Sequence, residues 1–117
     1  MKTLNSKLIL IAAVFCMMGS IAAYAGEYDI KQMTPEVREA LAGRQSRYAE
    51  LQAAKKSGAV SENDEGLVSG NPELAGAENH DRLVIYQTIA DQNNLGSGGL
   101  EIIKKTFAQT IRERDGR

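Results

Sequence analysis

The sequence predicts a small, mainly α domain of three amphipathic helices, with a short hairpin-like loop between the first and the second. Two observations carry this prediction. Apolar residues recur at steps of three and four along three separate stretches, which is the spacing of one helix face. Two of these stretches open with the same order of residue types (a capping side chain, a proline, an acid and an apolar residue), at Thr34–Val37 and Asn71–Leu74.

The first 25 residues are set apart from this domain. Met1 to Lys7 carries two lysines and no acid, Leu8 to Met18 is an unbroken apolar run, and the segment ends Ala23-Tyr24-Ala25. A basic start, a short apolar stretch and an Ala-x-Ala exit are typical of a secretory signal peptide. We therefore expect residues 1–25 to direct export and to be cleaved off after Ala25.

Two alternatives for this segment fit it less well. A membrane anchor would need to cross a hydrocarbon core of ~30 Å, whereas the eleven-residue run spans only about 16 Å as a helix. A lipoprotein would use Cys16, but Phe15 is too bulky a neighbour for a lipidated cysteine.

Cleavage also changes the chemistry of the chain. The only cysteine leaves with the signal, so the mature chain is expected to have no disulfide and no thiolate ligand or nucleophile. Lys2 and Lys7 leave as well, and the net charge falls from −1 to −3. This charge does not suggest nucleic acid as a partner and gives no general attraction to anionic lipid. The few large aliphatic residues predict a thin core, to which a partner could add buried surface.

The folded part is predicted to be one small helical domain over 34–117, after a flexible lead-in over 26–33. The first helix should run to Ser57, because Thr34 can cap it, Pro35 suits its first position and Gly58 ends it. Its stripe contains Val37, Leu41, Tyr48, Leu51 and Lys55, with Arg44 filling the gap.

The rest of the domain divides at turn residues. Apolar pieces at Val60 and Leu67-Val68 flank an Asn/Asp/Gly-containing turn, which indicates a small hairpin or an ordered loop lying on a helix. The second helix should run from the Asn71 cap to about Asn93. After a glycine-rich break over 94–99, the third should run from Leu100 to about Arg114. The stripe of this last helix contains Leu100, Ile103, Phe107 and Ile111.

The second helix carries the most particular segment of the chain. One of its faces contains Asn79, Arg82, Tyr86, Ile89 and Asn93. If this face is buried, Asn79 and Arg82 need partners, because an unsatisfied buried polar group costs ~1–3 kcal/mol. The 60–68 loop offers Glu62 for Arg82 and backbone carbonyls for Asn79.

Two motifs here resemble a known family. One is Gly58-Ala59-Val60-Ser61-Glu62-Asn63-x-x-Gly66-Leu67, and the other is Glu78-Asn79-x-Asp81-Arg82-x-x-x-Tyr86-x-x-Ile89-Ala90. With the helices around them, they resemble the YdbL-like family of small bacterial periplasmic proteins, a domain of unknown function. The resemblance spans most of Thr34 to Arg114. The chain departs from it at Ser61, where the family usually has glycine, and at Gly116-Arg117, where many members continue into a tail containing Gly and Trp.

The resemblance implies a periplasmic location and no enzyme activity, and the residues themselves indicate no cofactor and no metal. Such proteins tend to be encoded near a large membrane-anchored AsmA-like lipid-transport protein and a small lipoprotein. It therefore implies an accessory, chaperone-like role in cell-envelope lipid transport, with an envelope protein as partner and lipid contact left open. The residues that would form the binding or structural motif are Glu62, Asn63, Gly66, Asn79, Asp81, Arg82 and Tyr86.

Other chemistries have less support in these residues. His80 is the only histidine, so a metal site would lack His and Cys partners. The 94–99 break lacks the lysine of a phosphate-binding loop. The alternative to a binding protein is a small envelope hydrolase acting on lipid or peptidoglycan, with Glu62 as acid or base.

For two pairs of residues, the sequence allows both a functional and a structural interpretation. Glu62 and Arg82 could form a ligand site, but such a pair more often ties a loop to a helix. Tyr48 and Tyr86 could line a groove or simply pack. The apolar run Leu83–Ile85 is the better functional hint, as a docking surface for protein or lipid.

Overall fold

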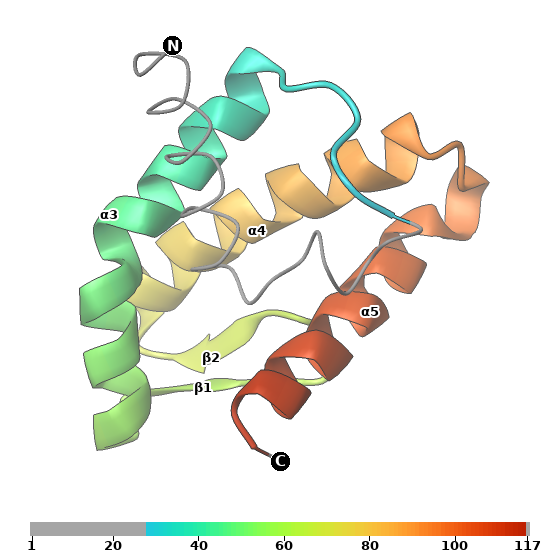
Figure 1. Ribbon diagram of the computed structural model, residues 1–117. Helices are drawn as coiled ribbons and strands as arrows, with labels where there is room; N and C mark the ends of the chain where they lie inside the picture. Colours follow the sequence, from blue (N-terminus) through green and yellow to red (C-terminus); the bar gives the residue numbers. More distant parts are fainter. Residues whose placement is uncertain (1–27, 117) are drawn as a thin grey trace, which may run out of the picture.

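The computed structural model describes residues 28–116, so the predicted signal peptide lies outside the described residues. The elements are α3 (Pro35–Ser57), β1 (Val60–Glu62), β2 (Val68–Gly70), α4 (Pro72–Gln92), the 3-10 turn η1 (Gly96–Gly98) and α5 (Gly99–Arg114). This order confirms the predicted mainly helical fold with a small hairpin between the first two helices (Figure 1). Within residues 28–116, no helix combines the length and apolar character needed to cross a membrane.

Helix α3 begins and ends at the predicted residues. The Thr34 Oγ1 accepts a hydrogen bond from the backbone N–H of Val37 at 3.1 Å, and Pro35 occupies the first position. Gly58 closes the helix with φ of 86°, a left-handed conformation that glycine adopts without a steric penalty. The cap residues alone were therefore enough to place this helix.

The hairpin closes one end of the three-helix arrangement (Figure 1). Strands β1 and β2 pair antiparallel, with Val60 opposite Gly70 and Glu62 opposite Val68. The buried side chains of Val60 and Val68 form a small cluster with Leu51 of α3 and with the start of α4. Two strands alone would be marginal, so this packing against the helices contributes to holding the hairpin in place.

Helix α4 is the central element, with α3 and α5 both packed against it. Asn71 caps it through a bond from the Leu74 N–H at 3.1 Å. The main core lies where the three helices meet, and its buried residues are Val37, Ala40, Leu41, Ile85, Tyr86, Ile89, Ala90, Ile103, Phe107 and Ile111. The rings of Tyr86 and Phe107 lie 4.1 Å apart between centroids.

The segment before α3 differs from the predicted flexible lead-in. The Gln92 side chain accepts hydrogen bonds from the backbone N–H groups of Lys31 and Gln32, at 2.7 and 2.9 Å, and donates to the Gln32 carbonyl at 2.7 Å. Apolar side chains of this segment pack on the core, namely Tyr28, Ile30 and Met33. Residues 28–33 are therefore docked against the fold, because Gln92 bonds the backbone of residues 31 and 32 and three apolar side chains of the segment pack on the core.

Candidate functional site

The polar residues singled out in the sequence gather where α3, the hairpin and α4 meet. We use "charge cluster" for the charged side chains there, which are Arg44, Arg47, Glu62, Glu78, Asp81 and Arg82. Three of them, Arg44, Glu78 and Arg82, are buried. A buried charge is tolerated only when it is paired and hydrogen-bonded, so the pairing decides what this cluster can do.

Arg82 lies at the centre of the charge cluster and is only 1% exposed. Its Nη1 and Nη2 donate to the two carboxylate oxygens of Glu62 at 2.7 and 2.8 Å. Its Nε donates to Glu78 Oε2 at 2.7 Å. The predicted pairing of Arg82 with Glu62 is confirmed, and its two-pronged geometry fixes the hairpin to α4.

Glu78 joins α4 to α3 and is fully buried, at 0% exposure. Besides Arg82, it accepts hydrogen bonds from Arg44 Nε at 2.9 Å and from Arg47 Nη1 at 3.0 Å. Glu78 is not among the site residues predicted from the sequence. The usable signals were an arginine in the apolar stripe of α3, which demands a buried acid, and the i, i+4 spacing of Glu78 and Arg82.

Asp81 extends the polar contact between α4 and α3 toward the surface. Its Oδ2 accepts from Arg47 Nη2 at 2.9 Å. It lies so close to Gly43 that a Cβ added to that glycine would overlap the carboxylate oxygen. Gly43 therefore costs helix propensity in α3 but allows the close approach of α4.

Gly66 connects the hairpin turn to the core. Its carbonyl accepts hydrogen bonds from the Tyr86 hydroxyl and from Arg82 Nη1, the latter at 3.1 Å. Its φ is 72°, and an added Cβ would lie 2.5 Å from the Lys104 carbonyl oxygen. Tyr86 is fully buried, and this burial raises the pKa of its hydroxyl to about 12. Tyr86 is thus a packing residue, and Tyr48 is half-buried.

The two asparagines act on the hairpin backbone. Asn79 bonds both backbone groups of Val68, accepting from its N–H at 2.8 Å and donating to its carbonyl at 2.9 Å. Asn63 accepts from the N–H groups of Glu65 and Leu67 at 2.8 and 3.2 Å, which shapes the turn. The predicted loop-carbonyl partner of Asn79 is confirmed.

The charge cluster holds the Glu62 carboxylate ionised. Burial alone would raise the pKa of Glu62, but hydrogen bonds and charge from Arg82, together with Lys55, bring it down to about 2. The Lys55 Nζ lies 3.1 Å from both Glu62 Oε2 and Asp115 Oδ2, as ion pairs without hydrogen-bond geometry. A general acid or base works best with a pKa near the working pH, so this geometry suits Glu62 to a structural tie and not to proton transfer.

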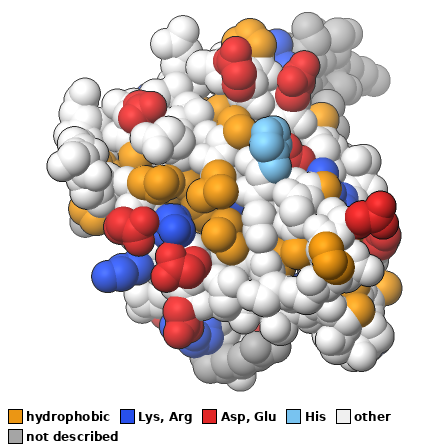
Figure 2. Space-filling view, turned by 180° about the vertical axis from the view of Figure 1, so that it is seen from behind, with side chains coloured by type: hydrophobic (Ala, Val, Ile, Leu, Met, Phe, Trp, Pro, Cys, Tyr) orange, Lys and Arg blue, Asp and Glu red, His pale blue; other side chains and the backbone are white. Residues whose placement is uncertain are grey.

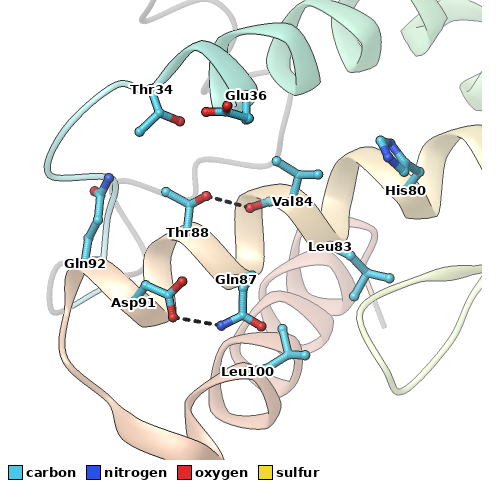
Figure 3. Close-up of a pocket in the computed structure, with 10 residues that line it drawn as sticks. All are labelled: Thr34, Glu36, His80, Leu83, Val84, Gln87, Thr88, Asp91, Gln92 and Leu100. Carbon is cyan, nitrogen blue, oxygen red and sulfur yellow. Dashed lines mark hydrogen bonds between the residues drawn. The ribbon is translucent and has the colours of Figure 1, made fainter.

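An open groove lies along another side of α4, with a volume of about 690 Å³. Figure 3 shows α4 as its floor, with the start of α3 on one side and Leu100 of α5 on the other. The residues that line this groove are Thr34, Glu36, His80, Leu83, Val84, Gln87, Thr88, Asp91, Gln92 and Leu100. Figure 2 shows apolar side chains gathered around the histidine on this face. The three apolar lining residues, Leu83, Val84 and Leu100, are half-buried.

Only part of the apolar run Leu83–Ile85, predicted as a docking surface, lies in the groove. Leu83 and Val84 line it, whereas Ile85 is 0% exposed and belongs to the core, so its predicted place on that surface was wrong. Helix α4 is apolar nearly all round at this point because α3 and α5 cover it from two directions. The groove is what they leave uncovered.

No protein-family model, curated protein or solved structure matches this chain. The likeness to the YdbL-like family therefore stays a prediction from the two motifs. Within residues 28–116, no three His, Cys, Asp or Glu side chains converge in a way that could hold a metal ion. The function must be argued from the contrast between the charge cluster and the groove.

Proposed function

We propose that this is a periplasmic accessory protein, exported by its first 25 residues, that acts by binding another protein of the cell envelope. The observation that carries the proposal is the open groove along α4, with Leu83, Val84 and Leu100 half-exposed in it. Exposed apolar surface in a concave position is typical of sites that bind a partner.

The charge cluster supports the proposal because its carboxylates are already engaged, which leaves the groove as the accessible site. Both oxygens of Glu62 are engaged by Arg82, and Glu78 and Asp81 are also held by arginines. A ligand at this place would have to break buried ion pairs, which costs several kcal/mol. The groove has no such obstacle.

The resemblance to the YdbL-like family gives the proposal its biological setting. It supports a chaperone-like role in cell-envelope lipid transport, with an AsmA-like protein or a lipoprotein as the partner. The family resemblance supports the proposal by analogy only, and the open groove supports it independently. The hydrolase alternative rested on Glu62, and no feature of the charge cluster favours it.

Site-specific photocrosslinking in producing cells tests the proposal. A photoreactive amino acid at the exposed position Gln87 of α4 should yield a discrete adduct, identified by mass spectrometry as an envelope protein. The matched position is Glu50, which is also exposed, lies on α3 and is not part of the groove lining. Equal adducts from both positions, or none from Gln87, would contradict the proposal.

A further inference from the structure

We propose that the groove takes a cationic amphipathic helix of the partner protein, with lysines or arginines beside an apolar stripe. This inference rests on the proposed function and adds the chemistry of the partner. It follows from the charges, the hydrogen-bonding capacity and the length of the groove.

The groove presents two acidic side chains. Its lining includes the acids Glu36 and Asp91 and contains no lysine or arginine. In the part of the chain that the structure describes, neither acid forms an ion pair. Elsewhere on the surface an acid does form an ion pair: Asp64 Oδ1 lies 2.6 Å from Arg112 Nη2. A cationic partner would complement the groove where the fold itself does not.

The spare hydrogen-bonding capacity points to the same chemistry. The Gln87 amide already donates to Asp91 Oδ1 at 2.9 Å, which leaves Gln87 Oε1 and Asp91 Oδ2 as acceptors (Figure 3). Thr88 donates to the Val84 carbonyl at 2.8 Å. Lysine and arginine supply donors without acceptors, so their side chains match this lining.

The charge of Asp91 is also unfavourable for the helix on which it lies. It is in the last turn of α4, where the helix dipole is negative and an acid is unfavourable by ~0.3–1 kcal/mol. No basic residue of α4 offsets it in that turn. Residues that are unfavourable for the local structure are expected at functional sites, and Asp91 fits that expectation.

The length of the groove fits a helix of about three turns. Its lining on α4 extends from His80 to Gln92, about 18 Å at the helical rise. An apolar stripe at i, i+3, i+4 and i+7 could contact Leu83, Val84 and Leu100, with the cationic residues facing the acids. A membrane surface is the poorer match, because anionic lipid headgroups would be repelled by Glu36 and Asp91.

Two designed helical peptides of about 18 residues test the inference, with the same apolar stripe and a polar face of either lysine or glutamate. Fluorescence anisotropy with the purified exported protein should show the lysine peptide binding about tenfold more tightly. Its amide NMR shifts should map to the groove lining, and its affinity should fall with added salt. Equal affinities, no binding, shifts outside the groove, or binding only to phosphatidylglycerol vesicles would overturn the inference, as would self-association in place of peptide binding.

Matched variants identify the acids responsible. The double variant Glu36→Gln with Asp91→Asn should bind the lysine peptide about tenfold less tightly, since each exposed charge contact contributes a factor of roughly three. Glu50→Gln, an exposed acid outside the groove lining, should leave the affinity unchanged. An equal loss in both variants would mean a general charge effect and would contradict the inference.

The two proposals fail in different ways. If Gln87 captures an envelope protein in cells but the two peptides bind equally, the proposed function stands and the cationic partner is wrong. If the lysine peptide occupies the groove but no envelope protein is captured in cells, the groove chemistry stands and the proposed function fails.

Discussion

The charge cluster and the groove lie on the same helix, α4, and differ in almost every physical respect. In the charge cluster, Arg82 and Glu78 are buried and fixed by hydrogen bonds of 2.7 to 3.0 Å. In the groove, Leu83 and Val84 are half-exposed and the acids lack cationic partners among the described residues. The contrast teaches that the most conspicuous polar motif of a sequence can serve the fold, while the surface open to a partner looks ordinary in sequence.

The largest effect is expected from Arg82→Leu. It leaves the half-buried Glu62 and the fully buried Glu78 without the cation that they share, which costs about 3–5 kcal/mol. In a domain of this size each kcal/mol corresponds to roughly 4–8 °C in Tm, so thermal unfolding followed by circular dichroism should show a drop of well over 10 °C.

The control for this prediction is Arg112→Leu, which removes an ion pair exposed on both sides and should cost under about 1 kcal/mol. If both variants melt within a few degrees of the wild-type protein, the charge cluster does not hold the fold.

The next effect comes from Glu62→Gln, and its size should depend on pH. The pKa of Glu62 is lowered from 4.5 to about 2, so its contribution is present above pH 4.5 and is lost as the pH falls toward 2. At pH 7 the variant should be less stable by about 3 kcal/mol in urea unfolding, and the difference should shrink on acidification. A pH-independent difference would contradict the ion-pair account.

A smaller difference in stability is expected between Gly66→Ala and Gly58→Ala. Both glycines have positive φ, of 72° and 86°, so both variants carry the backbone penalty of about 1 kcal/mol. Only at Gly66 does the new Cβ also meet a backbone atom, the Lys104 carbonyl oxygen at 2.5 Å. Gly66→Ala should therefore destabilise by about 2 kcal/mol more in urea unfolding. Equal losses would mean that the turn can move away from α5.

The smallest effect has the opposite sign. Asp91→Asn removes an unfavourable charge from the last turn of α4 and keeps an acceptor for Gln87, so stability should rise by a few tenths of a kcal/mol. Neutralising Glu62 and neutralising Asp91 thus move stability in opposite directions. A loss of more than about 1 kcal/mol in urea unfolding of Asp91→Asn would place this acid among the structural residues.

Much of the fold could be predicted from local residues. Thr34-Pro35, Gly58 and Asn71-Pro72 placed the helix ends because capping depends on a few neighbouring atoms. The ties from Arg82 to Glu62 and from Asn79 to Val68 were also predictable, because a polar residue on an apolar stripe needs a partner nearby.

Other features depended on contacts that local patterns do not encode. The Gln92 side chain holds the backbone of residues 31 and 32, and a surface glutamine gives no sign of such a role. Ile85 was assigned to the wrong side because a run that is apolar all round does not reveal which neighbour covers it. The groove itself arises from how α3 and α5 leave α4 uncovered, which only the packing shows.

The central claim is that the partner contacts the groove and not the polar motif with its hairpin. The most direct test compares photocrosslinking from Gln87 in the groove with photocrosslinking from Asp64 at the hairpin turn, whose side chain is 92% exposed. We predict that the same envelope protein is captured from Gln87 and not from Asp64. Capture from Asp64 with none from Gln87 would contradict the claim and return the function to the hairpin.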